Sequence, residues 1–137
     1  DMVFIGDTNF LVSAAIKPSS IPSIVLNIIL KDHELLFNRE TFKELKETLD
    51  KDKFKKYLAL SDKDSFLNNL VEKDTFKVTH ITTNICRDPK DNMFLSLAEE
   101  YLADFIITGD MDLLIIKQYK SSKIITPREA LEVINNH

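Results

Sequence analysis

The chain has 137 residues, the size of one compact domain, and we predict a single domain over residues 1–137. Its apolar fraction of 44% and charged fraction of 29% are those of an ordinary globular protein, which argues against a disordered chain or a coiled coil. The formal net charge of −4 argues against a broad surface that coats nucleic acid. It still allows a cleft in which bound cations turn a carboxylate cluster into a phosphate site.

The sequence gives no sign of membrane insertion or export. The longest apolar run, at residues 24–30, is interrupted by Asn27 and is well short of the roughly 20 residues that a membrane span needs. No basic start followed by an apolar stretch and a cleavage site is visible. The single cysteine, Cys86, cannot form an internal disulfide, so we expect a protein of the reducing cytoplasm with no membrane contact.

Apolar periodicity and turn residues predict strands that alternate with helices. The predicted strands are residues 2–6, 34–37, 76–81, 104–108 and 123–126. The predicted helices are residues 9–16, 22–30, 39–49, one or two within 51–73, 89–102, 112–118 and 127–135. This alternation predicts an α/β fold with a parallel sheet covered on both faces. Ligands of such sheets bind outside the carboxyl ends of the strands, so the residues after each strand are the candidates for a site.

Both glycines of the chain precede an aspartate at the end of an apolar strand. Gly6 precedes Asp7, and Gly109 precedes Asp110, with Asp112 two residues further on. Glycine allows a sharp turn at a strand end. Each aspartate could simply cap the following helix, which Asp favours. The repetition of the pattern nevertheless favours carboxylates gathered at the ligand edge of the sheet.

A third carboxylate, Asp91, lies in the first turn of the helix predicted from residue 89. It is in line with the apolar residues Phe94 and Ala98 of that helix, and Asp88 is the expected cap. A favourable interaction with the helix dipole would also explain an acid at this place. Alignment with the buried face favours a role in the crevice.

Glu44 cannot be selected by periodicity, because it lies away from the apolar stripe of its predicted helix. Glu40 and Glu47 are equally plausible, and a solvated side chain is the default interpretation for all three.

Carboxylates that converge in a crevice repel one another and raise each other's pKa unless cations compensate. Oxygen ligands without accompanying Cys or His suit Mg²⁺ or Mn²⁺ better than zinc. The three histidines, His33, His80 and His137, have no metal-ligand spacing. The pattern therefore indicates a site for phosphoryl transfer or phosphodiester cleavage.

The chain resembles the PIN-domain family, in particular its branch related to VapC-type toxins. The resemblance rests on five motifs in family order between Asp7 and Glu129, so it covers nearly the whole chain. They are Asp7-Thr8-Asn9, Phe42-Lys43-Glu44-Leu45, Cys86-Arg87-Asp88-Pro89-Lys90-Asp91-Asn92, Thr108-Gly109-Asp110-Met111-Asp112-Leu113 and Ile125-Thr126-Pro127-Arg128-Glu129.

The resemblance implies a three-layer sandwich around a five-stranded parallel sheet of order 3-2-1-4-5, with Mg²⁺- or Mn²⁺-dependent cleavage of RNA. It implies a catalytic and metal-binding quartet of Asp7, Glu44, Asp91 and Asp110, with Asp112 supporting the metal site. Further residues at the crevice would support the site or the substrate: Thr8, Asn9, Thr108, Asn92, Arg87 and Arg128. Cations that could hold RNA phosphates are Arg39, Lys43, Arg87, Lys90 and Arg128. A toxin of this branch would pair with a small antitoxin and commonly form a homodimer.

Other functions remain open at this point. Asn92 stands where relatives often carry another acid, so one or two ions could bind, and an inactive RNA-binding or assembly module is the alternative. A phospho-acceptor receiver domain would need an acidic pair after the first strand and a lysine after the fifth. Here Asp7 is followed by Thr8-Asn9, and the fifth strand by Pro127-Arg128. A magnesium phosphatase would need a second Asp two residues after Asp7, which is absent.

Overall fold

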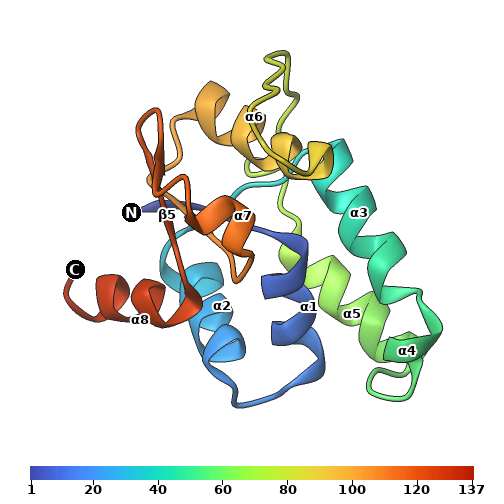
Figure 1. The fold of residues 1–137 in the computed structure, drawn as a ribbon. Coiled ribbons are helices and arrows are strands. Elements are labelled where there is room, and N and C mark those ends of the chain that lie inside the picture. The colour runs from blue at the N-terminus through green and yellow to red at the C-terminus, as the bar shows by residue number, and fades with distance from the viewer.

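Strands and helices alternate along the chain in a computed structural model that describes the backbone of residues 1–137 and the side chains of residues 1–59 and 62–137 (Figure 1). The strands are β1 (Val3–Gly6), β2 (Glu34–Leu35), β3 (Phe105–Ile107), β4 (Gln118–Tyr119) and β5 (Ser122–Ile125). The helices are α1 (Thr8–Ile16), α2 (Ile21–Asp32), α3 (Arg39–Leu49), α4 (Asp52–Lys55), α5 (Leu60–Leu70), α6 (Asn92–Tyr101), α7 (Met111–Leu114) and α8 (Pro127–Asn135). A 3₁₀ helix, η1 (Pro89–Asp91), leads into α6.

The five strands form one sheet in the order β2-β1-β3-β5-β4. Strands β2, β1, β3 and β5 run parallel to one another, and β4 pairs antiparallel with β5 at one edge. Phe4 of β1 is paired with Leu35 on one side and with Phe105 on the other. The predicted α/β class and the predicted neighbours of the first, second, fourth and fifth strands are therefore confirmed.

The segment predicted as the third strand, residues 76–81, lies beside β2 as expected but pairs only once. Phe76 forms a single parallel bridge with Phe37, and Lys77 donates to the Phe37 carbonyl at 2.7 Å. From His80 onward the backbone forms hydrogen bonds with α6 instead. The Ile81 N–H, for example, donates to Glu100 at 2.8 Å. The fifth strand of the sheet is instead β4, which the sequence analysis did not predict.

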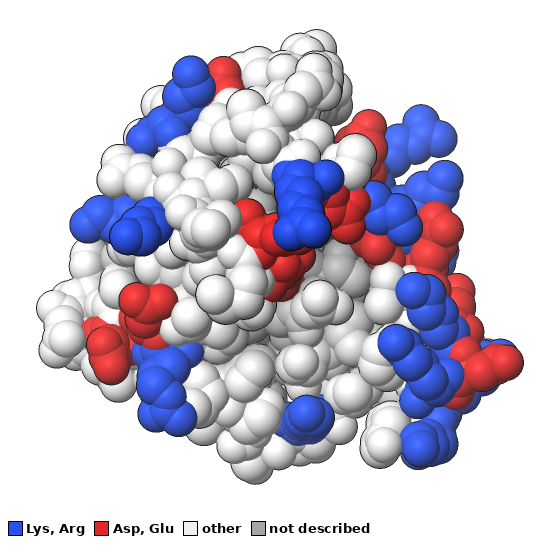
Figure 2. All heavy atoms as spheres, viewed as in Figure 1, with Lys and Arg blue, Asp and Glu red and all other residues white. Residues whose placement is uncertain are grey.

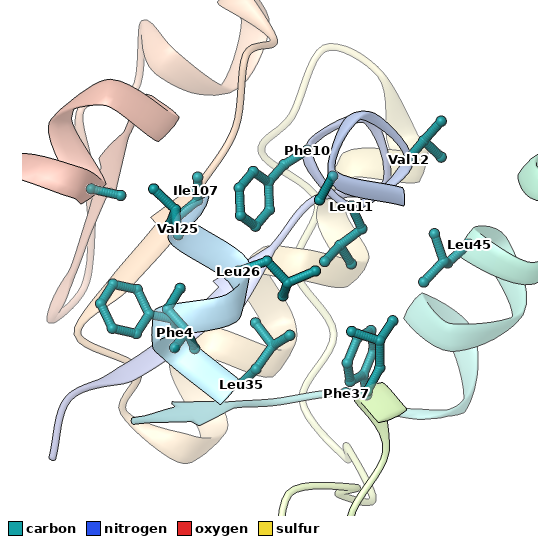
Figure 3. Close-up of a cluster of buried hydrophobic side chains, with 14 of the residues drawn as sticks. Phe4, Phe10, Leu11, Val12, Val25, Leu26, Leu35, Phe37, Leu45 and Ile107 are labelled. Carbon is teal, nitrogen blue, oxygen red and sulfur yellow. The ribbon is translucent and has the colours of Figure 1, made fainter. Parts of the chain in front are cut away.

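Alternating side chains of the central strands divide the core into two layers. Phe4 and Ile107 belong to the layer under α1, α2 and α8, as Figure 3 shows around Phe10 and Val25. The neighbouring residues in the strands, such as Ile5, belong to the second layer under α6 and α7. A period of two residues is what a strand buried on both faces produces. The predicted three-layer arrangement is confirmed.

Gly6 is needed for close packing and not for an unusual backbone angle. No glycine in the chain has a positive φ. A Cβ atom added at Gly6 would lie 2.7 Å from Cδ2 of Phe10, which is a clash, whereas one added at Gly109 would meet nothing within 4 Å. Neither glycine therefore adopts a backbone conformation that only glycine favours, and Gly6 lets α1 pack closely on β1.

In the part of the chain that the structure describes, no single helix is both long and apolar enough to cross a membrane. Only α1 and α2 taken together pass that test by length and composition, across a bend of 102°.

Candidate active site

A cavity of about 190 Å³ lies at the carboxyl ends of β1 and β3. Its walls include the four carboxylates that the sequence analysis singled out, and each comes from a different segment of the chain: Asp7, Glu44, Asp91 and Asp110. Thr8 and Asn9 also line it. In Figure 2, acidic side chains gather in the middle of the visible face, with cationic side chains beside them.

Asp7 is 4% exposed and has two roles. It caps α1 by accepting a hydrogen bond from the Phe10 N–H at 2.8 Å, and it accepts another from the hydroxyl of Thr108. Burial raises the pKa of Asp7 from 3.8 to about 6, with a further increase from the nearby Asp110, although both hydrogen bonds act in the opposite direction. The helix cap and the site carboxylate are therefore one residue and not alternatives.

Thr108 connects Asp7 with Asp110. Its fully buried hydroxyl donates to Asp7 and accepts from the Asp110 backbone N–H at 2.9 Å. The Asp110 carboxylate then caps α7 by accepting from the Asp112 backbone N–H at 2.9 Å. Because β1 and β3 are adjacent, this threonine fixes the two carboxylates relative to each other.

Asp91 is buried at the start of α6 with one oxygen unsatisfied. The residue is 9% exposed, and its Oδ2 has no hydrogen-bond partner in the described structure. Burial raises the pKa of Asp91 to about 7, with contributions from the negative charges of Asp110 and Asp88. The Thr8 hydroxyl in the same cavity is also buried without a partner. Buried oxygens of this kind are available to bind a water or an ion.

Glu44 reaches the cavity because α3 buries a second face. Thr41 and Thr48, three residues before it and four after it, are both buried, and the Thr48 hydroxyl donates to the Glu44 backbone carbonyl at 2.7 Å. Glu40 and Glu47 are exposed. The buried threonines at helical spacing were a signal in the sequence that could have selected Glu44 without any resemblance.

The cavity suits a hard divalent cation in the kind of ligands that it offers. It provides several carboxylate oxygens, one of them unsatisfied, and no sulfur or imidazole. Within the described side chains, however, no three Asp, Glu, His or Cys residues lie close enough together to hold a metal ion as placed. A site with three or more of these ligands would require the carboxylates to move toward one another, whereas Mg²⁺ needs only one or two carboxylates together with water and phosphate oxygens.

Several other predicted residues lie outside the cavity. The Asp112 side chain is 40% exposed and lies 3.8 Å from Nη1 of Arg87. Asn92 points its Oδ1 at the Cys86 N–H, from which it accepts at 2.9 Å. Arg128 is exposed at the first turn of α8. The structure does not bring Asp112, Arg87, Asn92 or Arg128 into the walls of the cavity.

Three lysines line the cavity beside the carboxylates: Lys51, Lys53 and Lys90. None of them makes an ion pair with a described side chain. Lys90 was among the predicted cations, whereas Arg39 and Lys43 are not in the cavity wall. Sequence reasoning missed Lys51 and Lys53, and their only signal was the cluster of lysines around the start of α4. Figure 2 shows cationic side chains interspersed with acidic ones at the right of the view, over α3 and α4.

Comparisons with known proteins agree with this fold. An uncharacterised protein of Methanocaldococcus jannaschii is 30% identical over 138 aligned positions, which cover 92% of this chain and 87% of that protein. A chain from the crystal structure of VapBC2 from Rickettsia felis, bound to a DNA fragment from their promoter, has a similar fold with a TM-score of 0.58. It is 16% identical, and the match covers 91% of this chain and 98% of that one. Residues 3–112 match the family described as PIN domain. The chain therefore belongs to the PIN domain family.

Proposed function

We propose that the protein is a Mg²⁺- or Mn²⁺-dependent endoribonuclease and the toxin of a toxin–antitoxin pair. The observation that carries this proposal is the cavity that four carboxylates from four separate segments line, with a buried Asp91 oxygen left unsatisfied. Membership in the PIN domain family supports a hydrolase that cleaves phosphodiester bonds.

Asp7, Asp91 and Asp110 would hold the ion or ions, with Glu44 as a further ligand. When bound, such an ion lowers the pKa of a coordinated water and offsets the negative charge of the phosphate. The raised pKa values of Asp7 and Asp91 support this assignment, because a nearby cation would favour the ionised form of both carboxylates. Asp112 could support the site only if its side chain turned away from Arg87.

The remaining residues of the cavity would orient the substrate and the attacking water. Thr108 holds Asp7 in place through its hydroxyl. Lys51, Lys53 and Lys90 are available for phosphate oxygens, since they have no partner among the described acids. If Glu44, which is half-buried on α3, is not a ligand of the ion, it would instead position the attacking water. The net charge of −4 makes these local lysines more important for RNA binding.

We further propose an antitoxin partner, a homodimer and a cytoplasmic location. The partner has support from the similar fold of a chain in the Rickettsia felis VapBC2 complex. The other two proposals rest on the resemblance to toxins of that branch.

The test is cleavage of single-stranded RNA by purified wild-type protein and by Asp110→Asn. We expect Mn²⁺-dependent cleavage by the wild type and a loss of roughly 100-fold or more in the variant, since one ligand of the ion is neutralised. Asp64→Asn on the exposed side of α5 is the matched control and should cleave like the wild type. Equal rates for Asp110→Asn and the wild type would refute the proposal.

One observation favours the alternative of an inactive RNA-binding or assembly module. Within the described residues the carboxylates are not close enough to form a ready metal site. Under that alternative, the wild type would bind single-stranded RNA but cut none of it, with or without Mn²⁺.

A further inference from the structure

Residues 79–86 form a segment without regular secondary structure, and three side chains of α6 accept hydrogen bonds from its backbone. Oδ1 of Asn92 accepts from the Cys86 N–H at 2.9 Å, and Oγ of Ser96 accepts from the Thr83 N–H at 3.1 Å. Glu100 accepts from the Ile81 N–H at 2.8 Å. The three side chains are spaced by four residues, which places them on one face of the helix. The 79–86 segment is therefore fixed along its length, although it pairs with no strand.

A groove of about 330 Å³ lies between the 79–86 segment, α6 and the start of α3. Its apolar lining includes Ile81, Pro89 and Met93, and its amide lining includes Asn84 and Asn92. No lysine or arginine lines it. In Figure 1 the segment runs beside α6, away from the sheet.

The groove adjoins the carboxylate cavity. Met93 lines both, and the short helix η1 separates them, with Pro89 on the groove side and Asp91 on the cavity side. The two spaces differ in chemistry, because the cavity holds carboxylates and lysines, whereas the groove is lined by apolar, amide and hydroxyl side chains together with His80 and Glu40. A chain molecule that places a phosphate in the cavity can therefore reach the groove with its neighbouring unit.

The lining of the groove suits a flat, uncharged ring with polar edges. Apolar walls favour stacking or packing on the faces of such a ring, and amides recognise its edges by paired hydrogen bonds. Asn84 is exposed and unbonded among the described residues. Asn92 has committed its oxygen to Cys86, so its amide N–H₂ remains available as a donor. A phosphate is disfavoured, since Glu40, the only acid in the described lining, would repel it.

We propose that this groove binds the base of a nucleotide next to the scissile phosphate of single-stranded RNA. The proposal rests on the proposed nuclease function and extends it to a base-recognition subsite. A segment already fixed by α6 lowers the entropic cost of binding, because its order does not have to be created by the ligand.

The first test is independent of cleavage. ¹⁵N-labelled wild-type protein with EDTA is titrated with each of the four nucleoside 5′-monophosphates and with ribose 5-phosphate, to about 10 mM, a range suited to weak binding. We expect at least one nucleotide to shift the side-chain amide signals of Asn84 and Asn92, with ribose 5-phosphate leaving them in place. The proposal is overturned if no nucleotide shifts them, or if ribose 5-phosphate shifts them equally; either result would leave the nuclease proposal standing.

The second test measures base preference in cleavage. Single-stranded RNAs that carry each of the four bases at the positions beside the cleaved bond are compared by kcat/KM in Mn²⁺. We expect the wild type to discriminate by about 10-fold or more at one position, and Asn84→Ala to lose most of that discrimination. Asn68→Ala, an exposed asparagine of α5, is the control and should keep the preference.

The two proposals fail in different ways. If Asn84→Ala lowers kcat/KM equally for all four bases, or leaves the preference unchanged, the base-recognition subsite is refuted. If the wild type cuts none of the RNAs, the nuclease proposal fails and the nucleotide titration alone decides whether the groove binds a base.

Discussion

Replacing Asp7 with asparagine is expected to stabilise the metal-free protein at neutral pH. The variant has nearly the same shape and keeps one oxygen that can accept from the Phe10 N–H, but its N–H₂ replaces the oxygen that accepts from Thr108, which takes about 1 kcal/mol from the gain. It removes a carboxylate whose pKa is raised from 3.8 to about 6, mainly by burial. A shift of that size corresponds to at most about 3 kcal/mol of lost stability near pH 7. The remaining gain of about 2 kcal/mol is, for a chain of 137 residues, roughly 7 °C in melting temperature.

The pH dependence gives the sign of the effect. The folded protein holds the Asp7 proton up to about pH 6, whereas the unfolded chain releases it near pH 3.8. Over that interval the folded state binds more protons, so wild-type stability falls as the pH rises. The advantage of Asp7→Asn should therefore change from about 2 kcal/mol near pH 7 to a loss of about 0.5 kcal/mol near pH 4.

Divalent metal should make the wild type more stable than Asp7→Asn, which reverses the order expected without metal. A cation bound at the cavity offsets the buried charge of Asp7, so Mn²⁺ should stabilise the wild type and give the variant little. The assay is urea or thermal unfolding of both proteins at acidic and neutral pH, with and without Mn²⁺, with Asp64→Asn as the control. The reasoning is refuted if Asp7→Asn is less stable than the wild type without metal near pH 7. It is also refuted if Mn²⁺ stabilises the variant as much as it stabilises the wild type.

Three further predictions follow from packing and charge around the cavity. Thr108→Val leaves two hydrogen-bonding groups unsatisfied and should cost about 1–3 kcal/mol in urea unfolding, whereas an unchanged midpoint would contradict the role given to its hydroxyl. Gly6→Ala should destabilise by about 1–3 kcal/mol through its clash with Phe10, and adding Phe10→Leu should recover part of that loss; no recovery would mean that the strain lies elsewhere. The double variant Lys51→Ala, Lys53→Ala should raise the KM for single-stranded RNA and reduce the slope of log affinity against log salt by about 1.4 if each lysine contacts one phosphate, and an unchanged slope would exclude those contacts.

The sequence predicted the architecture well where the signal is local. Strands buried on both faces are continuous apolar runs, and the parallel connections between them leave few possible arrangements. The positions of Asp7 and Asp110 followed from the same reasoning, because residues after adjacent parallel strands meet at one edge of the sheet. Their convergence was thus predictable without knowing the loops.

The parts that sequence reasoning missed depend on contacts between distant segments. The segment predicted as a strand at residues 76–81 pairs with the sheet only at Phe76. From His80 onward its backbone N–H groups donate to side chains of α6 such as Glu100. The sequence of that segment alone does not show that acceptors on α6 will replace its pairing with β2. Lys51 and Lys53 belong to the cavity only because α4 folds back against it, and a lysine-rich segment by itself indicates solvent exposure.

The hydrogen bond from Thr108 to Asp7 joins residues that stand 101 positions apart in the chain. The backbone N–H of Asp7 likewise needs the Ile107 carbonyl of β3, which it reaches at 3.0 Å. A polypeptide growing from its N-terminus therefore lacks both contacts until Ile107 and Thr108 have been synthesised. Whatever chemistry the four carboxylates perform, a nascent fragment that ends before Thr108 cannot carry it.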